Sequence, residues 1–117
     1  MPSSHTDALL SSLREPAGRP PGEATAVHPR LYRSEEILAL EQREIFAKEW
    51  LCLGRSADIP ASGDYLTFAI GDQPVVAIRN RAGSITTHAN VCLHRMMRLL
   101  DGCGNAKRIL CPYHAWT

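Results

Sequence analysis

Two short pairs of metal-binding side chains constrain this chain more than any other feature of its sequence. The first pair is Cys92 and His94, and the second is Cys111 and His114, with sixteen residues between them. Each pair offers one thiolate and one imidazole, which are common ligands of zinc and iron. A bound metal also adds folding free energy, which matters in a chain of only 117 residues. We therefore expect the pairs to form two loops around one metal centre.

Three interpretations of the pairs remain open at this point. Two cysteines and two histidines suit a structural zinc ion, but zinc fingers usually group cysteine with cysteine and histidine with histidine, whereas each pair here is mixed. Coincidence is improbable because the mixed pair occurs twice, across a connection that contains Gly102 and Gly104. A [2Fe–2S] cluster with two cysteines on one iron and two histidines on the other fits best.

Composition and charge exclude several classes of protein. The 13 basic and 12 acidic residues give a net charge of +1, which provides no basic excess for nucleic acid. No apolar run approaches the ~20 residues of a membrane helix, and the N-terminus lacks the features of a secretory signal. We expect a cytoplasmic protein without nucleic-acid or membrane partners. Its four cysteines are then reduced or metal-bound rather than paired in disulfides.

The first half of the chain predicts an arm and one helix. Residues 1–27 carry a cluster of prolines and glycines and predict a flexible arm, with one or two amphipathic turns near Leu9. Residues 28–49 predict a helical region, in which a helix begins after Ser34 as N-cap and runs to about Lys48. Glu44 and Lys48 are spaced to form an ion pair on this helix.

The second half, residues 50–117, changes to short apolar segments separated by turns. The run Trp50–Leu53 predicts a buried strand, and residues 65–70, 75–78 and 84–87 predict strands of an antiparallel sheet. The predicted fold class is therefore mostly β, with an N-terminal helix followed by a small antiparallel domain that carries the ligand loops.

The complete pattern of the loops, Cys-x-His, sixteen residues and Cys-Pro-Tyr-His-x-Trp, resembles the Rieske motif. With Arg95 after the first histidine and Trp116 two residues after the second, it is similar to the N-terminal part of the large (alpha) subunit of Rieske-type non-haem iron aromatic-ring-hydroxylating oxygenases. The resemblance covers about residues 31–117 and includes segments at 45–51, 58–60 and 63–65.

The resemblance implies how a Rieske [2Fe–2S] cluster would be held. Cys92 and Cys111 would bind the buried iron, and His94 and His114 the outer iron, on the path of the electron. Two ferric ions, two sulfides and two thiolates sum to zero charge. A neutral centre accepts an electron more readily than a four-thiolate cluster of charge −2, which is consistent with the higher potentials of Rieske centres.

Three further residues would surround the cluster if the resemblance holds. Tyr113 and Trp116 would exclude water, and the Tyr113 hydroxyl would donate a hydrogen bond to a sulfur. Arg95 would add positive charge, which favours the reduced form and an acidic electron donor. The chain also departs from the family, which usually has glycine where Met96 and Ala115 stand. A side chain there restricts the backbone of each loop.

The resemblance implies a function for the parent protein rather than for residues 50–117 alone. Electrons from a ferredoxin or reductase would pass through the cluster to a mononuclear Fe(II) that activates O₂, in a trimer-based homo- or hetero-oligomer. The family holds that iron with two histidines and a carboxylate in a C-terminal domain, and nothing in this sequence matches them. We therefore expect an incomplete Rieske domain without oxygenase activity of its own. The alternatives are a stand-alone Rieske ferredoxin and a structural zinc module.

Overall fold

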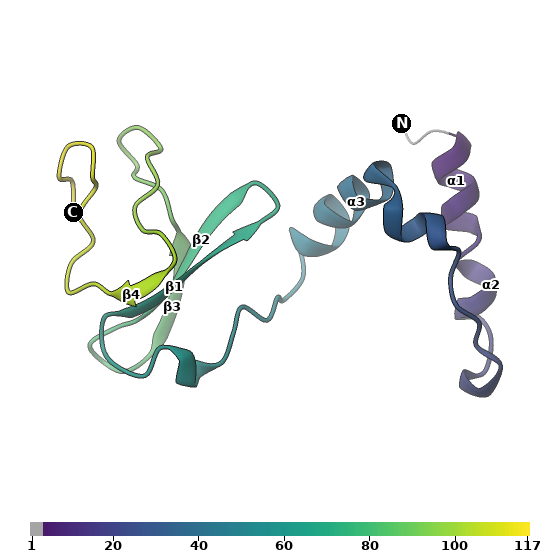
Figure 1. Cartoon of the computed structure of the whole chain (residues 1–117), viewed down its shortest axis with the longest axis horizontal. Helices are drawn as coiled ribbons and strands as arrows, with labels where there is room; N and C mark the ends of the chain where they lie inside the picture. The colour runs from purple at the N-terminus through teal and green to yellow at the C-terminus, as the bar shows by residue number, and fades with distance from the viewer. Residues whose placement is uncertain (1–3) are drawn as a thin grey trace. The chain divides into compact units, whose positions relative to one another are not determined.

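The computed structural model describes residues 4–117, and the chain divides into two compact units, Met1–Glu49 and Trp50–Thr117. The first unit is helical and the second contains an antiparallel sheet (Figure 1). The predicted fold class, a helical region followed by a small antiparallel β domain, is confirmed. Across residues 4–117, no helix combines the length and apolar character that a membrane span requires.

The first unit is more regular near its start than the sequence predicts. Residues 1–27 are predicted to form a flexible arm, but helix α1 covers Ser4–Ser11 and helix α2 covers Arg14–Ala17, while residues 1–3 lie outside the described part. A short 3₁₀ helix at Pro21–Glu23 follows. Leu9 is buried with Leu31 and Ile37, and burying one leucine contributes about 2 kcal/mol. The apolar face of α1 thus packs on residues of the following helices and contributes to the core of this unit.

The predicted helix of this unit is confirmed in its start and altered in its second half. The 3₁₀ helix η2, Pro29–Arg33, leads to Ser34, whose Oγ accepts a hydrogen bond from the Ile37 N–H at 3.3 Å and caps helix α3, Glu35–Glu41. The chain continues as a π-helical turn, Gln42–Phe46. Glu44 forms the predicted ion pair with Lys48, which, with Arg43, lowers the pKa of Glu44 to about 2.

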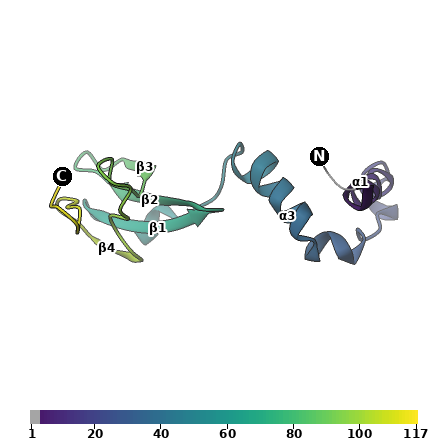
Figure 2. The same ribbon diagram turned by 90° about the horizontal axis from the view of Figure 1, so that it is seen from above.

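The sheet of the second unit is a three-stranded meander with a short fourth strand. Strands β1 (Asp64–Ile70), β2 (Gln73–Arg79) and β3 (Ile85–Ala89) confirm the three predicted strands of the meander, and the order across the sheet is β3-β2-β1-β4 (Figure 2). Strand β4, Cys103–Asn105, was not predicted because its three residues include no β-branched or large apolar side chain. A 3₁₀ turn at Ser56–Asp58 precedes β1.

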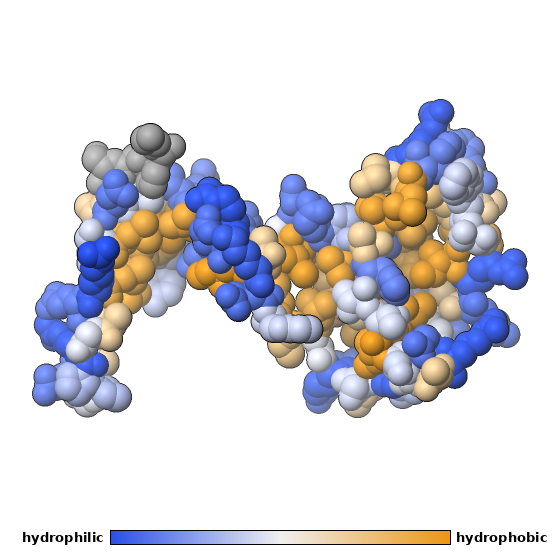
Figure 3. Space-filling view, turned by 180° about the vertical axis from the view of Figure 1, so that it is seen from behind, coloured by the Kyte–Doolittle hydropathy of each residue, from blue (hydrophilic) through white to orange (hydrophobic). Residues whose placement is uncertain are grey.

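The predicted buried strand at Trp50–Leu53 is wrong. The segment belongs to no strand, and Trp50 is fully exposed (101%). Leu51 and Leu53 instead line a small hollow over one face of the sheet, together with Leu66 and Phe68. The apolar run therefore supplies side chains to the sheet face without adding hydrogen bonds to its edge. Apolar residues are also visible on the surface of this unit in Figure 3.

The two ligand loops leave the two edge strands of this sheet. The first follows β3 and the second follows β4, and these strands lie at opposite edges. The loops nevertheless meet, because ring contacts join them: His94 of the first loop contacts His114 and Trp116 of the second. Both loops extend from the same end of the sheet in Figure 1. The sheet thus brings together ligands that are far apart in the sequence.

Candidate metal centre

The two loops have the same closing hydrogen bonds although their sequences differ. In the first loop the Cys92 carbonyl accepts from the Met96 N–H at 2.8 Å, and in the second the Cys111 carbonyl accepts from the Ala115 N–H at 2.9 Å. The N–H of Cys92 donates to the Met97 carbonyl (2.8 Å), as the N–H of Cys111 donates to the Trp116 carbonyl (2.7 Å). Each cysteine therefore begins a turn that ends four residues later.

The four predicted ligands are brought together, and they are sorted by kind. Cys92 and Cys111 are buried (5% and 3% exposed), and the Cys92 side chain lies close enough to lower the pKa of the Cys111 thiol. The rings of His94 and His114 lie 5.1 Å apart, centroid to centroid, and both residues are exposed. Two inner sulfurs and two outer imidazoles match a [2Fe–2S] cluster in which one iron takes the thiolates and the other takes the histidines.

The backbone of the second loop favours the thiolate form of its cysteine. The N–H of Tyr113 is the largest cause of a lowered pKa at the Cys111 thiol, and the N–H of His114 and the Cys92 side chain lower it further. Burial acts in the opposite direction, but it does not cancel these hydrogen bonds. Since the thiolate is the species that binds metal, the loop is preorganised for a metal ligand at Cys111.

An aromatic ring covers each of the two histidines. Trp116 lies parallel to His94, with ring centroids 4.9 Å apart and planes 5° from parallel. Tyr113 stacks on His114 at 3.9 Å and 22°. The Trp116 contact crosses from one loop to the other, so it ties the loops together as well as fixing a ring. Both predicted aromatic residues therefore contact the site through the imidazoles.

Arg95 is the predicted site residue that the structure leaves apart from the others. It is exposed, and its side chain forms no hydrogen bond or ion pair within residues 4–117. The neighbouring Arg98 is paired with Asp101 at 3.1 Å. Any effect of Arg95 on a cluster would therefore act through its charge and not through a hydrogen bond present in this structure.

Asn90 is a structural determinant of the first loop that the sequence did not reveal. It is almost completely buried (1% exposed) and precedes the loop. Its side-chain amide donates to the Leu100 carbonyl at 2.7 Å and accepts from the Leu100 N–H at 3.0 Å, while its N–H donates to the Pro74 carbonyl at 2.8 Å. Asn90 thereby joins the two ends of the first loop and attaches them to strand β2.

The second loop depends on a different and more exposed anchor. The Asn105 side chain in β4 donates to the Asp64 carboxylate at 2.8 Å and to the Ser62 carbonyl at 3.0 Å. The carboxylate also accepts from the Ala61 N–H at 2.7 Å. The Asn105 amide is the largest cause of a lowered pKa at Asp64, followed by the Ala61 N–H. The strand that leads to the second loop is thus fixed by an ionised group.

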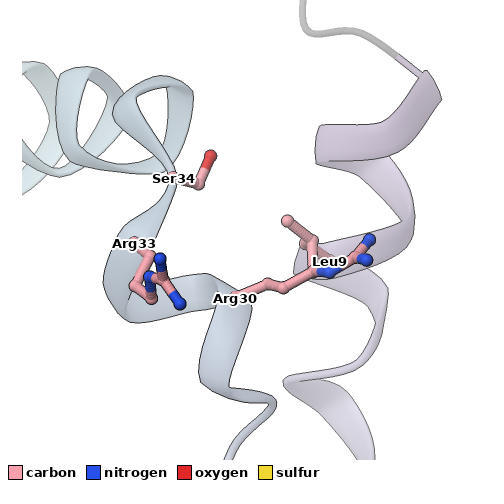
Figure 4. Close-up of a pocket in the computed structure, with 4 residues that line it drawn as sticks. All are labelled: Leu9, Arg30, Arg33 and Ser34. Carbon is pink, nitrogen blue, oxygen red and sulfur yellow. The ribbon is translucent and has the colours of Figure 1, made fainter.

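Two hollows bear on where ligands could sit. One, of about 480 Å³, borders Cys92 and Trp116 and is lined mainly by apolar residues such as Val76, Leu99 and Ile109. The side of the centre that contains the Cys92 sulfur therefore borders a mainly apolar lining. The other lies in the helical unit, is lined by Leu9, Arg30, Arg33 and Ser34 (Figure 4), and contains none of the predicted site residues.

A structural zinc ion is the other centre that two cysteines and two histidines could form. Within residues 4–117, no group of three or more histidine, cysteine, aspartate or glutamate side chains converges as one ion would require. A tetrahedral zinc site needs four ligands around one point. In this structure Cys92 lies beside Cys111 and His94 lies beside His114, which is the pairing that a two-iron cluster requires.

Comparison with known proteins identifies the family. The family model of the Rieske [2Fe-2S] domain matches residues 49–117, and the chain belongs to this family, in the form found in the N-terminal part of oxygenase alpha subunits. The glycine betaine monooxygenase oxygenase subunit of Chromohalobacter salexigens is 46% identical over 95% of this chain and 24% of its own length. A benzene 1,2-dioxygenase subunit alpha of Pseudomonas putida is 41% identical over 96% of this chain and 24% of its own length.

Solved structures give the same result. The naphthalene 1,2-dioxygenase from Rhodococcus sp., bound to indole, superposes with a TM-score of 0.80 at 28% identity over 99% of this chain and 26% of its own. The quaternary ammonium Rieske monooxygenase CntA superposes with a TM-score of 0.68 at 38% identity over 74% of this chain and 24% of its own. The chain spans about a quarter of the length of the curated relatives.

Proposed function

We propose that Cys92, His94, Cys111 and His114 hold a Rieske [2Fe–2S] cluster that carries electrons within an oxygenase alpha subunit. The observation that supports this most directly is the sorting of the ligands: two buried cysteines lie together, and two exposed histidines lie together with rings 5.1 Å apart. When bound, a Rieske cluster accepts and donates one electron at a potential well above that of four-cysteine clusters.

The residues around such a centre would have different roles. Cys92 and Cys111 are buried, and Cys92 borders a hollow with a mainly apolar lining, so the sulfur side of the centre would lie away from bulk solvent. The exposed edges of His94 and His114 are where an electron donor would approach. Trp116 and Tyr113 hold these two rings in fixed orientations, so that little rearrangement accompanies gain or loss of the electron.

The same proposal extends to the parent protein and its partners. A ferredoxin or reductase would deliver electrons to the histidine side, and the electrons would reach a mononuclear Fe(II) held elsewhere in the parent, where O₂ is activated on an organic substrate. One solved relative is described as giving insights into inter-subunit electron transfer, which supports an oligomer here; the trimer-based form is what the family resemblance implies. The reported relatives are oxygenase subunits, which favours the oxygenase over the stand-alone ferredoxin.

The relatives do not share a substrate. One is named for glycine betaine and another for benzene, and both match almost the whole of this chain. The matched part is therefore common to enzymes of different specificity. We propose that the selection of substrate depends on residues outside the matched part, and that residues 1–117 alone do not turn over an oxygenase substrate.

The test is anaerobic reconstitution of the purified chain with iron and sulfide, compared with loading by zinc alone. We expect about two irons and two sulfides per chain and a Rieske-type EPR signal after reduction. Cys92→Ser and His94→Ala each remove a proposed ligand. Their controls are Cys103→Ser and His88→Ala, because Cys103 and His88 are exposed and are not among the four proposed ligands. Only the Cys92 and His94 variants should lose the signal. Tight zinc binding without cluster formation would refute the proposal.

A further inference from the structure

The two loops share a backbone feature that their closing hydrogen bonds explain. Met96 and Ala115 have φ angles of +55° and +57°, and they are the two non-glycine residues of positive φ among residues 4–117. Each donates its N–H to the carbonyl of the cysteine four residues earlier. Each therefore occupies the fifth position of its loop, where the chain turns into the left-handed region before it closes.

We infer that Met96 and Ala115 are positioning residues, whose left-handed backbone sets the direction of the histidine-bearing part of each loop at a conformational cost that glycine would avoid. This inference rests on the proposed cluster site. For an L-residue the left-handed region brings Cβ close to the following carbonyl oxygen, at about 1–2 kcal/mol per residue. Glycine has no Cβ and adopts the region freely.

The geometry after each turn shows why the left-handed residue is needed. The residue that follows it, Met97 or Trp116, turns its carbonyl back to accept the N–H of the cysteine that began the loop. In the second loop this same turn places the Trp116 ring parallel to His94 of the first loop. A residue that cannot adopt positive φ would open the loop and displace both the ligand and its stacking partner.

The inference also distinguishes the loops. Ala115 directly follows its ligand His114, whereas Arg95 stands between Met96 and His94. The histidine is the fourth residue of the second loop and the third residue of the first, although the closing bonds are the same. A change at Ala115 should therefore disturb its histidine more than a comparable change at Met96.

The sharpest test changes only the chirality at residue 115. Because Cys111 begins the last seven residues, a peptide covering residues 111–117 can be joined to a thioester of residues 1–110 by ligation at that cysteine. D-Ala and L-Ala at position 115 have the same composition and the same unfolded-chain entropy, but D-Ala prefers positive φ. We expect the D-Ala protein to lose its cluster to a chelator about tenfold more slowly, with an unchanged EPR spectrum.

Variants in the first loop provide a second test. Met96→Gly should slow cluster loss by about threefold because glycine adopts positive φ freely. The effect is smaller than that of D-Ala because glycine also gains entropy in the unfolded chain, which opposes it. Met97→Gly is the matched control and should not slow the loss. Met96→Val should lose the cluster or change its EPR spectrum, because a β-branched residue is a genuine outlier at positive φ. A Met96→Val protein with the parent spectrum and loss rate, or equal rates for the D-Ala and L-Ala proteins, would overturn the inference.

The two proposals fail in different ways. A parent chain that binds no cluster refutes the proposed function. In that case the inference is still decided by the HN–Hα nuclear Overhauser effects within Met96 and Ala115 in the cluster-free chain, because the two protons lie closest together at positive φ. Strong effects at both residues, beyond those of their neighbours, support it, and effects of the ordinary strength of an extended or helical backbone refute it.

Discussion

The two ligand loops have the same closing hydrogen bonds, but different side chains anchor them to the rest of the domain. The first is fixed by Asn90, a neutral side chain that is 1% exposed and bonds both the N–H and the carbonyl of Leu100. The second follows β4, which is fixed by a surface hydrogen bond between Asn105 and the ionised Asp64. The first loop thus depends on burial and the second on charge, so the two halves of one centre should respond differently to mutation and to pH.

The largest expected effect comes from removing the buried anchor. Asn90→Ala deletes two hydrogen bonds and leaves the Leu100 N–H and carbonyl without partners, which should lower the free energy of unfolding by about 3 kcal/mol. Urea unfolding of the second unit measures it. Asn105→Ala is the matched control at the other anchor and should cost about 1 kcal/mol, because Asn105 is exposed. Equal losses would contradict the difference between the anchors.

The next effect concerns the contact that joins the loops. Trp116→Ala removes the ring stacked on His94 and should destabilise the pair of loops by about 1 kcal/mol. Trp116→Phe should retain about half of this contribution, since a ring remains. Trp50→Ala is the control, because Trp50 is fully exposed (101%). If Trp50→Ala and Trp116→Ala lower the free energy of unfolding equally, the stack of Trp116 on His94 contributes nothing measurable.

A smaller effect should appear on acidification, and only at the second loop. The pKa of Asp64 is lowered from its ordinary value of 3.8, mainly by the Asn105 amide, so its stabilising contribution is present above pH 3.8 and is lost as the pH falls through the lower folded value. Amide exchange of β4 should accelerate over that range, while exchange at Leu100 should not. The Asp64→Asn variant should show no such step, and a step that persists there belongs to another group.

The smallest effect is expected at the Tyr113 hydroxyl. The Tyr113 ring stacks on His114, but its hydroxyl makes no hydrogen bond within residues 4–117. Tyr113→Phe keeps the stack and should change the unfolding free energy of the cluster-free chain by less than about 0.5 kcal/mol. Tyr113→Ala should cost about 1 kcal/mol by comparison. A large loss in the phenylalanine variant would show that the hydroxyl supports the loop.

The sequence predicted correctly those elements whose structure is determined by neighbouring residues. Strand β1, the Ser34 cap and the Glu44–Lys48 ion pair all involve residues close together in the chain, and all three are found as predicted. The departures from the family at Met96 and Ala115 indicated a restricted backbone, but not the left-handed conformation that both residues adopt.

The structural features that the sequence did not predict depend on contacts between distant segments. Strand β4 exists only because β1 offers it a partner, with Leu66 opposite Cys103, and its own residues do not favour a strand. The run Trp50–Leu53 has strand composition, but no neighbouring strand pairs with it within the described residues. Asn90 carries no local signal, since its importance comes from Leu100, ten residues further along the chain.

The central claim is that one iron of a Rieske cluster is held by His94 and His114. It is tested most directly by pulsed EPR of the reduced, reconstituted chain with ¹⁵N-labelled histidine. The account predicts couplings from two histidine nitrogens, with one of them lost in His94→Ala or His114→Ala wherever a cluster survives, and both retained in His88→Ala. A reduced cluster without histidine couplings, or with couplings that His88→Ala removes, would contradict it.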